Sequence, residues 1–342
     1  MGQIVTSFTT YTGKQSEFRE LITQKFSQYP ALAALGFNVV NDIQSVKKMY
    51  KTPYLDKITK KRVGCSTTST ETGNGVAVTS FDLAVTDMQV QLPLCADVFA
   101  STIAETALKK GFDINNLEGT EIETMLAEMI LEASGRDAFR TLFLGDTTLS
   151  NTDYTAFDGL FKKLKAGYLA ADGTVQADGS ITSTDINLTN IVTTFNNFID
   201  AQPSELKYMD DAAKVFYVTH PVYEAWKRYL QSTNFSGVGA QRDALINGIP
   251  TLSFNGIPVV SLGLLSKYID TDFATGSPAS SATANRIILT TPENHYIATD
   301  LLEDTAKLDF WYERKEDTNY TRLRYKLGFN YAFGNMNVIG GW

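Results

Sequence analysis

The sequence predicts an α+β fold, and three features of its 342 residues support that assignment. Residues 120–143 repeat apolar side chains at i, i+3 and i+4, which indicates one long helix. Residues 76–92 and 321–333 alternate apolar and polar side chains, which is typical of strands with two unlike faces. A basic, extended stretch precedes both. The predicted order is therefore arm, hairpin, long helix, mixed middle and sheet.

The N-terminal region predicts a helix followed by an arm. Apolar side chains in residues 14–30 recur near helical spacing until Pro30 ends the pattern. Residues 37–62 are extended and basic, with little sign of a core of their own, and we expect them to lie on another surface. Residues 1–62 contain ten Lys and Arg against four Asp and Glu, or +6, so the remainder carries −14 of the total of −8.

Residues 63–95 predict a long, projecting hairpin. A polar, turn-rich stretch at 65–75 precedes "VAVTSFDLAVTDMQVQL", where β-branched residues alternate with polar ones. Residues 63–108 contain no Lys or Arg, and their acidic residues are Glu71, Asp82, Asp87, Asp97 and Glu105. Either surface charge clusters here by accident, or this acidic segment docks onto a basic surface, such as that of another subunit.

Two helices are expected next. The first, at 96–109, is short, whereas the second begins at Thr120 and Glu123, which have capping-box spacing. A helix of about 24 residues would span about 36 Å, long enough to act as the backbone of a domain.

The middle of the chain mixes elements. Residues 185–200 predict an amphipathic helix, and "AKVFYVTHPVYEAWKRYL" changes from strand to helix, with Pro221 in the first helical turn. "GIPTLSFNGIPVV" predicts two short strands joined by a turn. The two Ala-Asp-Gly triplets between 171 and 179 indicate turns rather than a calcium loop, and residues 274–285 indicate an exposed loop.

The C-terminus predicts a sheet whose last strand has one aromatic and one basic face. Arg322, Arg324 and Lys326 alternate with apolar residues, namely Leu323, Tyr325, Leu327, Phe329, Tyr331 and Phe333. Such a strand could stack bases in a nucleic-acid groove. We favour the other interpretation, in which the aromatic face is buried in a sheet and the charges point outward.

Composition narrows the function. A net charge of −8 opposes a dedicated DNA-binding protein, because neutralising phosphates requires a basic surface. No run of about 18 apolar residues is present, so we expect a soluble protein without a membrane partner. Cys65 and Cys95 permit one disulfide but are expected to be reduced and structural. They share no metal-ligand spacing with His220 and His295.

No motif indicates catalysis or a cofactor. The chain contains no phosphate-binding loop, no G-x-S-x-G and no H-E-x-x-H. We therefore predict no enzyme and no catalytic, cofactor-binding or metal-binding residues. His220, at a strand-to-helix junction, and His295, where a turn enters a strand, are predicted to be structural. A triad that uses either histidine and depends on the fold stays open.

The ordered set of features resembles the major capsid proteins of tailed bacteriophages, the Hong Kong-type fold shared with encapsulins. The resemblance covers nearly the whole chain and includes "TLFLGDTTLSNTDYTAFDGLFKKL", with its "GD" and "DGL", together with the strand-to-helix segment and the C-terminal strands. It implies five parts: an N-terminal arm (1–62), an extended loop (63–95), a peripheral domain with a spine helix (96–165 and 120–143), an apical α/β domain (166–290) and returning peripheral strands (291–342).

The resemblance also implies a function. Many copies would form hexamers and pentamers of an icosahedral shell around double-stranded DNA, with scaffold, portal and decoration proteins as further partners. The protein would assemble in the cytoplasm of a bacterial host and reside in the virion, contacting packaged DNA weakly. Two features depart from some relatives: residues 63–95 contain no lysine for cross-linking, and no long charged scaffolding region precedes the arm.

We hypothesise that the acidic residues of the hairpin meet a basic surface of a neighbouring subunit. The acidic side comprises Glu71, Asp82 and Asp87, and the candidates for the basic side are Lys47, Lys48, Lys51, Lys60, Lys61, Arg62, Arg322, Arg324 and Lys326.

Three rival interpretations remain. An encapsulin-like compartment would share the fold but bind a cargo peptide. A tail tube protein would use strands and an insertion loop, but the long central helix opposes it. A hydrolase would require His220 or His295 to be essential.

Overall fold

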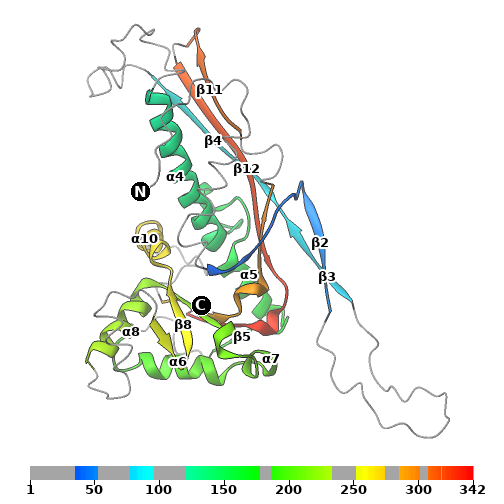
Figure 1. The fold of residues 1–342 in the computed structure, drawn as a ribbon, viewed down its shortest axis with the longest axis vertical. Coiled ribbons are helices and arrows are strands. Elements are labelled where there is room, and N and C mark those ends of the chain that lie inside the picture. Colours follow the sequence, from blue (N-terminus) through cyan, green and yellow to red (C-terminus); the bar gives the residue numbers. More distant parts are fainter. Residues whose placement is uncertain are drawn as a thin grey trace, which may run out of the picture.

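The computed structural model describes residues 35–52, 78–95, 121–177, 186–232, 252–273, 285–300, 307–316 and 318–341. The expected helices at 14–30 and 96–109 lie outside these residues. The described elements form an elongated upper layer, in which α4 runs along a long sheet, and a compact lower α/β layer (Figure 1).

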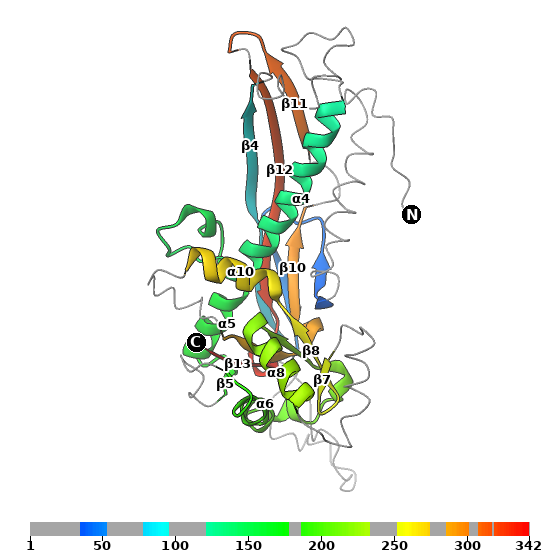
Figure 2. The ribbon, with the colours of Figure 1, turned by 90° about the vertical axis from the view of Figure 1, so that its left-hand side faces the viewer.

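The predicted long helix is confirmed as α4 (Glu121–Leu144), a single helix of 24 residues. It packs lengthwise on one face of a five-stranded sheet, as Figure 2 shows. The buried side chains of α4 include Ile130, Phe139 and Phe143, while Met129 on the opposite side is 58% exposed. The helix thus buries one stripe against the sheet, as its apolar spacing predicted.

The long sheet is built around its C-terminal strand, β12 (Thr318–Tyr331). On one side β12 pairs with β11 (Lys307–Glu313) and then β10 (His295–Thr299), both antiparallel. On its other side it pairs with β4 (Thr86–Leu94), also antiparallel, and β1 (Asn38–Val40) adds to β10 in parallel. The predicted alternation of β12 is confirmed, because Leu323, Tyr325, Leu327 and Phe329 are buried in the core that includes α4.

A two-stranded ribbon stands beside this sheet (Figure 1). It consists of β2 (Val46–Lys51) and β3 (Thr79–Ala84), which pair antiparallel. The ribbon therefore includes residues that we had placed in the N-terminal arm, and β4, which we had placed in the projecting hairpin, lies in the long sheet. The alternation in β3 and β4 predicted strands but not their partners, because pairing partners are set by contacts distant in sequence.

The ribbon meets the sheet where β3 crosses β12 at Gly328. A Cβ on Gly328 would lie 1.9 Å from the carbonyl oxygen of Ala84, so the crossing leaves no room for a side chain. A small apolar cluster under the crossing joins Leu83 and Ile43 to Ala298. The crossing thus anchors the base of the ribbon.

The lower layer contains a mixed six-stranded sheet in the order β5 (Val175–Gln176), β13 (Asn337–Gly340), β9 (Ile287–Thr290), β6 (Val215–Val218), β8 (Ile257–Ser261) and β7 (Leu252–Phe254). The predicted β6-to-helix junction is confirmed by α8 (His220–Ser232). The predicted β7–β8 hairpin is also confirmed, with Asn255 and Gly256 at φ 50° and 86°, as a type I′ turn requires.

This sheet separates two cores. Phe216 and Val218 point into a cluster with α8 and α6 (Ile191–Asp200), whereas Tyr217 between them points into the cluster shared with α4. The remaining described helices are α5 (Leu160–Leu169), α7 (Ser204–Lys207), α10 (Gly263–Asp272) and four 3-10 turns: Thr152–Tyr154, Asp211–Ala213, Pro292–Asn294 and Gly334–Met336. The amphipathic helix expected at 185–200 begins later, at Ile191.

Candidate inter-subunit surface

The charged residues of β12 lie on the face of the long sheet that is turned away from α4. Cross-strand register places Arg322 opposite Asp309 of β11 and Gln91 of β4, and it places Lys326 opposite Asp87. Because cross-strand partners share a face, carboxylates, amides and cations alternate across this surface. It is therefore a mixed-charge face rather than a purely basic one.

Arg322 is held within the chain. Its guanidinium donates to Asp309 Oδ2 at 3.1 Å and lies 5.3 Å from the centre of the Trp311 ring. The Trp311 ring in turn stacks on Tyr320 at 5.5 Å. The cation–π contact and the partly exposed ion pair fix the guanidinium on the sheet.

Lys326 ties three segments together. Its ammonium donates to the carbonyl oxygen of Gln44 at 2.7 Å and lies 3.4 Å from Asp300 Oδ2 and 3.9 Å from Asp87 Oδ1. Asp87 itself is well exposed. One of the three acidic residues in our interface hypothesis thus already lies beside a cation of its own chain.

A polar cleft of about 850 Å³ opens on this face. Its lining includes Ser45, Gln89 and Arg324, together with the acids Asp87, Asp300 and Asp309. Arg324 is exposed, and no carboxylate of the described residues forms an ion pair with it. Of the three cations on β12, Arg324 is the one that its own described neighbours leave available.

The outer face of the ribbon carries opposite charges and apolar side chains. Lys48 of β2 faces Asp82 of β3, and both are exposed without an ion pair to another described residue. Val46 and Tyr50, on the same face, are 56% and 74% exposed. Such exposure of large side chains beside charges is typical of a surface that contacts a partner.

Lys47 and Lys51 lie on the inner side of the ribbon. Lys47 is exposed, whereas Lys51 donates to the carbonyl oxygen of Ala332 and lies 5.0 Å from the centre of the Phe333 ring. Lys51 therefore fastens the ribbon to the end of β12. The other members of the hypothesis, Glu71, Lys60, Lys61 and Arg62, lie outside the described residues.

Sequence reasoning missed the carboxylates that balance β12. Asp309 and Asp300 contact Arg322 and Lys326, yet neither entered our hypothesis. A signal existed for Asp309, because the alternation in "KLDFWYE" places it on the polar face of β11. No comparable signal existed for Asp300, which follows β10.

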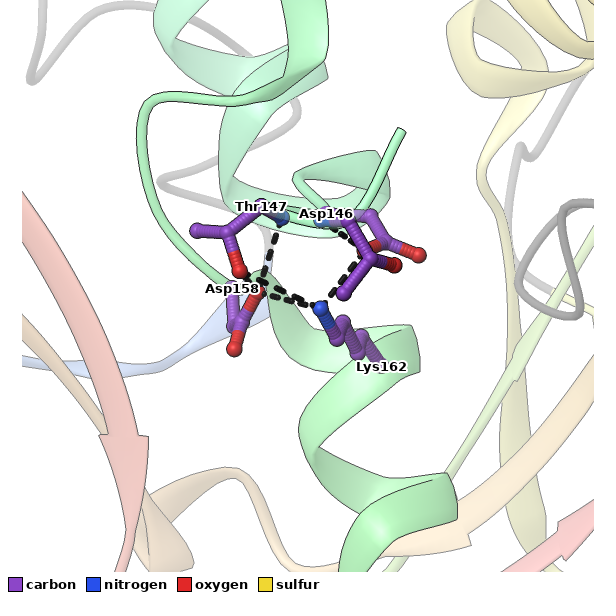
Figure 3. A network of polar contacts seen from close by, with 5 residues as sticks. Asp146, Thr147, Asp158 and Lys162 are labelled. Atoms are coloured by element: carbon purple, nitrogen blue, oxygen red, sulfur yellow. Dashed lines mark hydrogen bonds and ion pairs between the residues drawn. The ribbon is translucent and has the colours of Figure 1, made fainter. Parts of the chain in front are cut away.

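The "GD" and "DGL" segments meet at the joint between α4 and α5. The Lys162 ammonium lies 2.6 Å from Asp146 and 2.8 Å from Asp158, and the backbone N–H and hydroxyl of Thr147 both donate to Asp158 (Figure 3). A Cβ on Gly145 would lie 2.3 Å from the carbonyl oxygen of Phe157, so the two segments pack backbone to backbone.

Both carboxylates of this joint are held ionised. Burial raises the pKa of Asp146, but hydrogen bonds from Lys162 and Thr148 outweigh it and leave that pKa below its ordinary value. The same balance of burial against the Lys162 and Thr147 bonds lowers the pKa of Asp158. The pKa of Lys162 is raised, because its two carboxylate partners outweigh its burial.

The histidines have structural surroundings. His295 is fully buried between the rings of Phe37 and Phe329, at centroid distances of 5.0 and 5.8 Å, and burial lowers its pKa to about 3. Because Thr290 Oγ1 donates to Asn337, it accepts from the Nε2–H of His295 at 3.0 Å. His220 is exposed at the start of α8. Among the described residues, no cluster of His, Cys, Asp and Glu is placed to hold a metal ion.

No helix in the described ranges has the length and apolarity needed to span a bilayer. Cys95 is an exposed free thiol, while Cys65 lies outside the described residues. None of these features builds a reaction centre, so the candidate site of this protein is a contact surface.

Comparison with solved structures places this arrangement. A chain of the satellite phage P4 procapsid matches over 97% of this chain and 93% of its own, with a TM-score of 0.62 and 11% identity. This protein has the fold of tailed-phage capsid proteins. A chain in the capsid of Myoviridae phage XM1 also shares the capsid fold, over 90% of each chain, with a TM-score of 0.56 and 13% identity.

A chain of Microbacterium phage Oxtober96 is similar to this one as well, over 90% of both chains, with a TM-score of 0.52 and 12% identity. No protein-family model and no curated protein sequence matches this chain. The capsid fold is therefore recognised through its tertiary arrangement, at an identity too low for sequence comparison.

Proposed function

We propose that the chain is the major capsid subunit of a tailed bacteriophage, which self-assembles into the hexamers and pentamers of an icosahedral shell around double-stranded DNA. The observation that carries the proposal is the match to the phage P4 procapsid chain over 97% of this chain. A match of that extent includes the ribbon and the long sheet as well as the compact lower layer.

The shape of the subunit suits this role. The long sheet, α4 and the projecting ribbon present extended surfaces for contact with several neighbours at once (Figure 1). In a closed symmetric lattice, modest interfaces multiply, because each subunit is held by all its neighbours together. Weak individual contacts then suffice for a stable shell.

The charge distribution narrows our interface hypothesis. Arg322 and Lys326 already contact carboxylates of their own chain, so we propose Arg324 as the main cation of β12 that meets a neighbour. Asp82 and Lys48, exposed on the outer face of the ribbon, are the matching candidates on the other side. A ribbon that reaches the polar cleft of the next subunit would bring Asp82 to Arg324.

Paired charge reversals test this contact. We expect Asp82→Lys to weaken assembly of purified subunits, and Asp82→Lys combined with Arg324→Glu to restore it, because the pair is then reversed rather than broken. Asp270→Lys is a matched control, since Asp270 is exposed on α10. Restoration by Lys48→Glu instead of Arg324→Glu would mean that Asp82 acts within its own ribbon.

The proposed function itself is tested by negative-stain electron microscopy beside sedimentation. Closed shells, or rings of five and six subunits, are the expected result. A uniform monomer under every salt and crowding condition would contradict it. Co-purified DNA distinguishes a phage capsid from an encapsulin-like compartment, which would hold a cargo protein instead.

The remaining partners follow from the same proposal. We infer a separate scaffold, a portal and decoration proteins, weak contact with the packaged DNA, and a location in the virion. The P4 procapsid whose fold this chain shares includes a size determination protein, which supports a separate assembly factor here.

A further inference from the structure

The outer edge of β4 is an open sheet edge. Strand β4 pairs through residues 86–94 with β12, and no described strand pairs with its other side. Figure 2 shows β4 at the margin of the long sheet. An edge of this kind presents unpaired N–H and C=O groups that can pair with another chain.

The same edge is already used one step earlier along the chain. Strand β2 pairs with β3 on this side, and the last bond of that ladder runs from the Val85 N–H to the carbonyl oxygen of Ser45, at 2.9 Å. The chain then turns away, because the Ile43 N–H donates to Thr299 of β10 instead. The position beside β4 is thus left empty by the described residues where β2 leaves it.

Two observations identify the backbone groups that point to this edge. N–H groups alternate sides along a strand, and that of Val85 points to the β2 side, so those of residues 87, 89 and 91 point the same way. Pro93, which has no N–H, falls on the same odd-numbered set, where it removes no bond to β12. Asp87, Gln89 and Gln91 therefore offer N–H and C=O groups outward at regular spacing.

The edge has little of the protection that exposed edges usually carry. Lysines, prolines and bulges commonly block such edges, yet from Thr86 to Leu92 the strand is in continuous register with β12 and its one charge is Asp87. Met88 and Val90 pack toward the core, which holds the strand in place. A nine-residue strand fixed in this way is a preorganised template for a second strand.

We propose that this edge pairs with the same edge of a second copy of the chain, as an antiparallel β4–β4 contact about a two-fold axis through Gln89. In that register Gln89 faces Gln89 of the partner subunit, and Asp87 faces the partner's Gln91. Each carboxylate then meets an amide, and the two Asp87 side chains lie at opposite ends of the contact. The edge is self-complementary in charge, which selects a second copy as its occupant.

The register makes opposite predictions for neighbouring residues. Gln91→Lys places a cation opposite Asp87 of the partner, so we expect the dimer to tighten by about three- to tenfold. Gln89→Lys places two cations opposite each other at the axis, so we expect it to weaken by about threefold, with recovery at high salt. Sedimentation equilibrium of the full chain below its assembly concentration measures both.

Cysteine cross-linking tests the register directly. In the full chain with Cys65→Ser and Cys95→Ser, Gln89→Cys should form a disulfide-linked dimer on mild oxidation, because hydrogen-bonded antiparallel partners have Cα atoms about 5.5 Å apart. Asp87→Cys or Gln91→Cys alone should not, whereas the two together should. These side chains are exposed on the sheet, so the variants are expected to fold, as circular dichroism would verify.

A chain that stays monomeric at every concentration, or that cross-links equally through all three positions, would overturn the β4–β4 contact. The proposal does not depend on the capsid function, since rings and shells are scored separately by electron microscopy. Shells without β4 cross-links would leave the proposed function intact and reject this contact.

Discussion

The ammonium of Lys162 lies 2.6 Å from the carboxylate of Asp146, and this pair closes the joint between the end of α4 and the start of α5. The side chain of Asp146 is 5% exposed and that of Lys162 is 23% exposed, so the pair is largely shielded from water. The longest helix of the fold is therefore tied to the rest of the body by a charge-assisted contact.

Removing the cation should destabilise this joint. We expect Lys162→Met to lower the free energy of unfolding by about 2 kcal/mol, because two partly buried carboxylates lose a charged hydrogen bond. Urea denaturation of dissociated subunits measures it. Lys227→Met is the matched control: its ion pair with Glu224 is more exposed, so it should cost less than about 1 kcal/mol. Equal costs for the two variants would contradict the importance of the joint.

The joint should also make stability depend on acid. The pKa values of Asp146 and Asp158 are lowered by folding, so their contribution is present above the ordinary value of 3.8 and is lost as pH falls through the folded values. We therefore expect the wild type to lose more stability between pH 5 and 2.5 than a variant carrying both Asp146→Asn and Lys162→Met. Parallel curves in urea titrations across this range would refute the prediction.

His295 predicts a second pH dependence at milder acidity. Its pKa is lowered to about 3 by burial, so the unfolded chain, with an ordinary value of 6.5, binds the proton first. Its contribution is full above pH 6.5 and falls by about 1.4 kcal/mol per pH unit toward pH 3. His295→Gln should flatten stability between pH 6.5 and 5.

The control for His295 is the other histidine. His220→Gln should keep the wild-type slope, because this side chain is exposed in the folded chain as it is in the unfolded one. If the slope of His295→Gln matched that of the wild type, the buried imidazole would not be the group that titrates.

Gly328 should be indispensable for seating the ribbon. Gly328→Ala places a methyl group 1.9 Å from the carbonyl oxygen of Ala84, and overpacking of this kind typically costs about 1–3 kcal/mol. We expect faster hydrogen exchange in β2 and β3 and impaired assembly. Gly263→Ala is the control, because its nearest neighbour, Ser261 Oγ, is 3.8 Å away. Unchanged exchange in Gly328→Ala would show that β3 can shift without cost.

Local patterns foretold the elements that their own residues determine. The spacing in α4 placed the helix within one residue of Glu121–Leu144, and the alternation of β12 separated Tyr325 and Phe329 from Arg322 and Lys326. The turn at Asn255 and Gly256 was equally visible. In each case the side-chain period or the required φ angle acts over a few neighbouring residues.

Partners distant in sequence were not foretold. The ribbon joins β2 to β3 across 27 residues between Lys51 and Thr79, and the hypothesis of a purely inter-subunit charge contact missed Asp309 and Asp300. The alternation of a strand states which residues share a face, but it does not state which strand lies beside it.

By itself, therefore, the sequence determined the helix, the two-faced strands, the uneven charge and the order of elements that resembles a capsid subunit. Only the tertiary structure decided which charges are satisfied within the chain, where β3 crosses β12, and that the edge of β4 stays open among the described residues. The physical reason is range: propensity and periodicity act locally, whereas ion pairs such as Lys326–Asp300 and ladders such as β4–β12 exist only once the chain has closed its long loops.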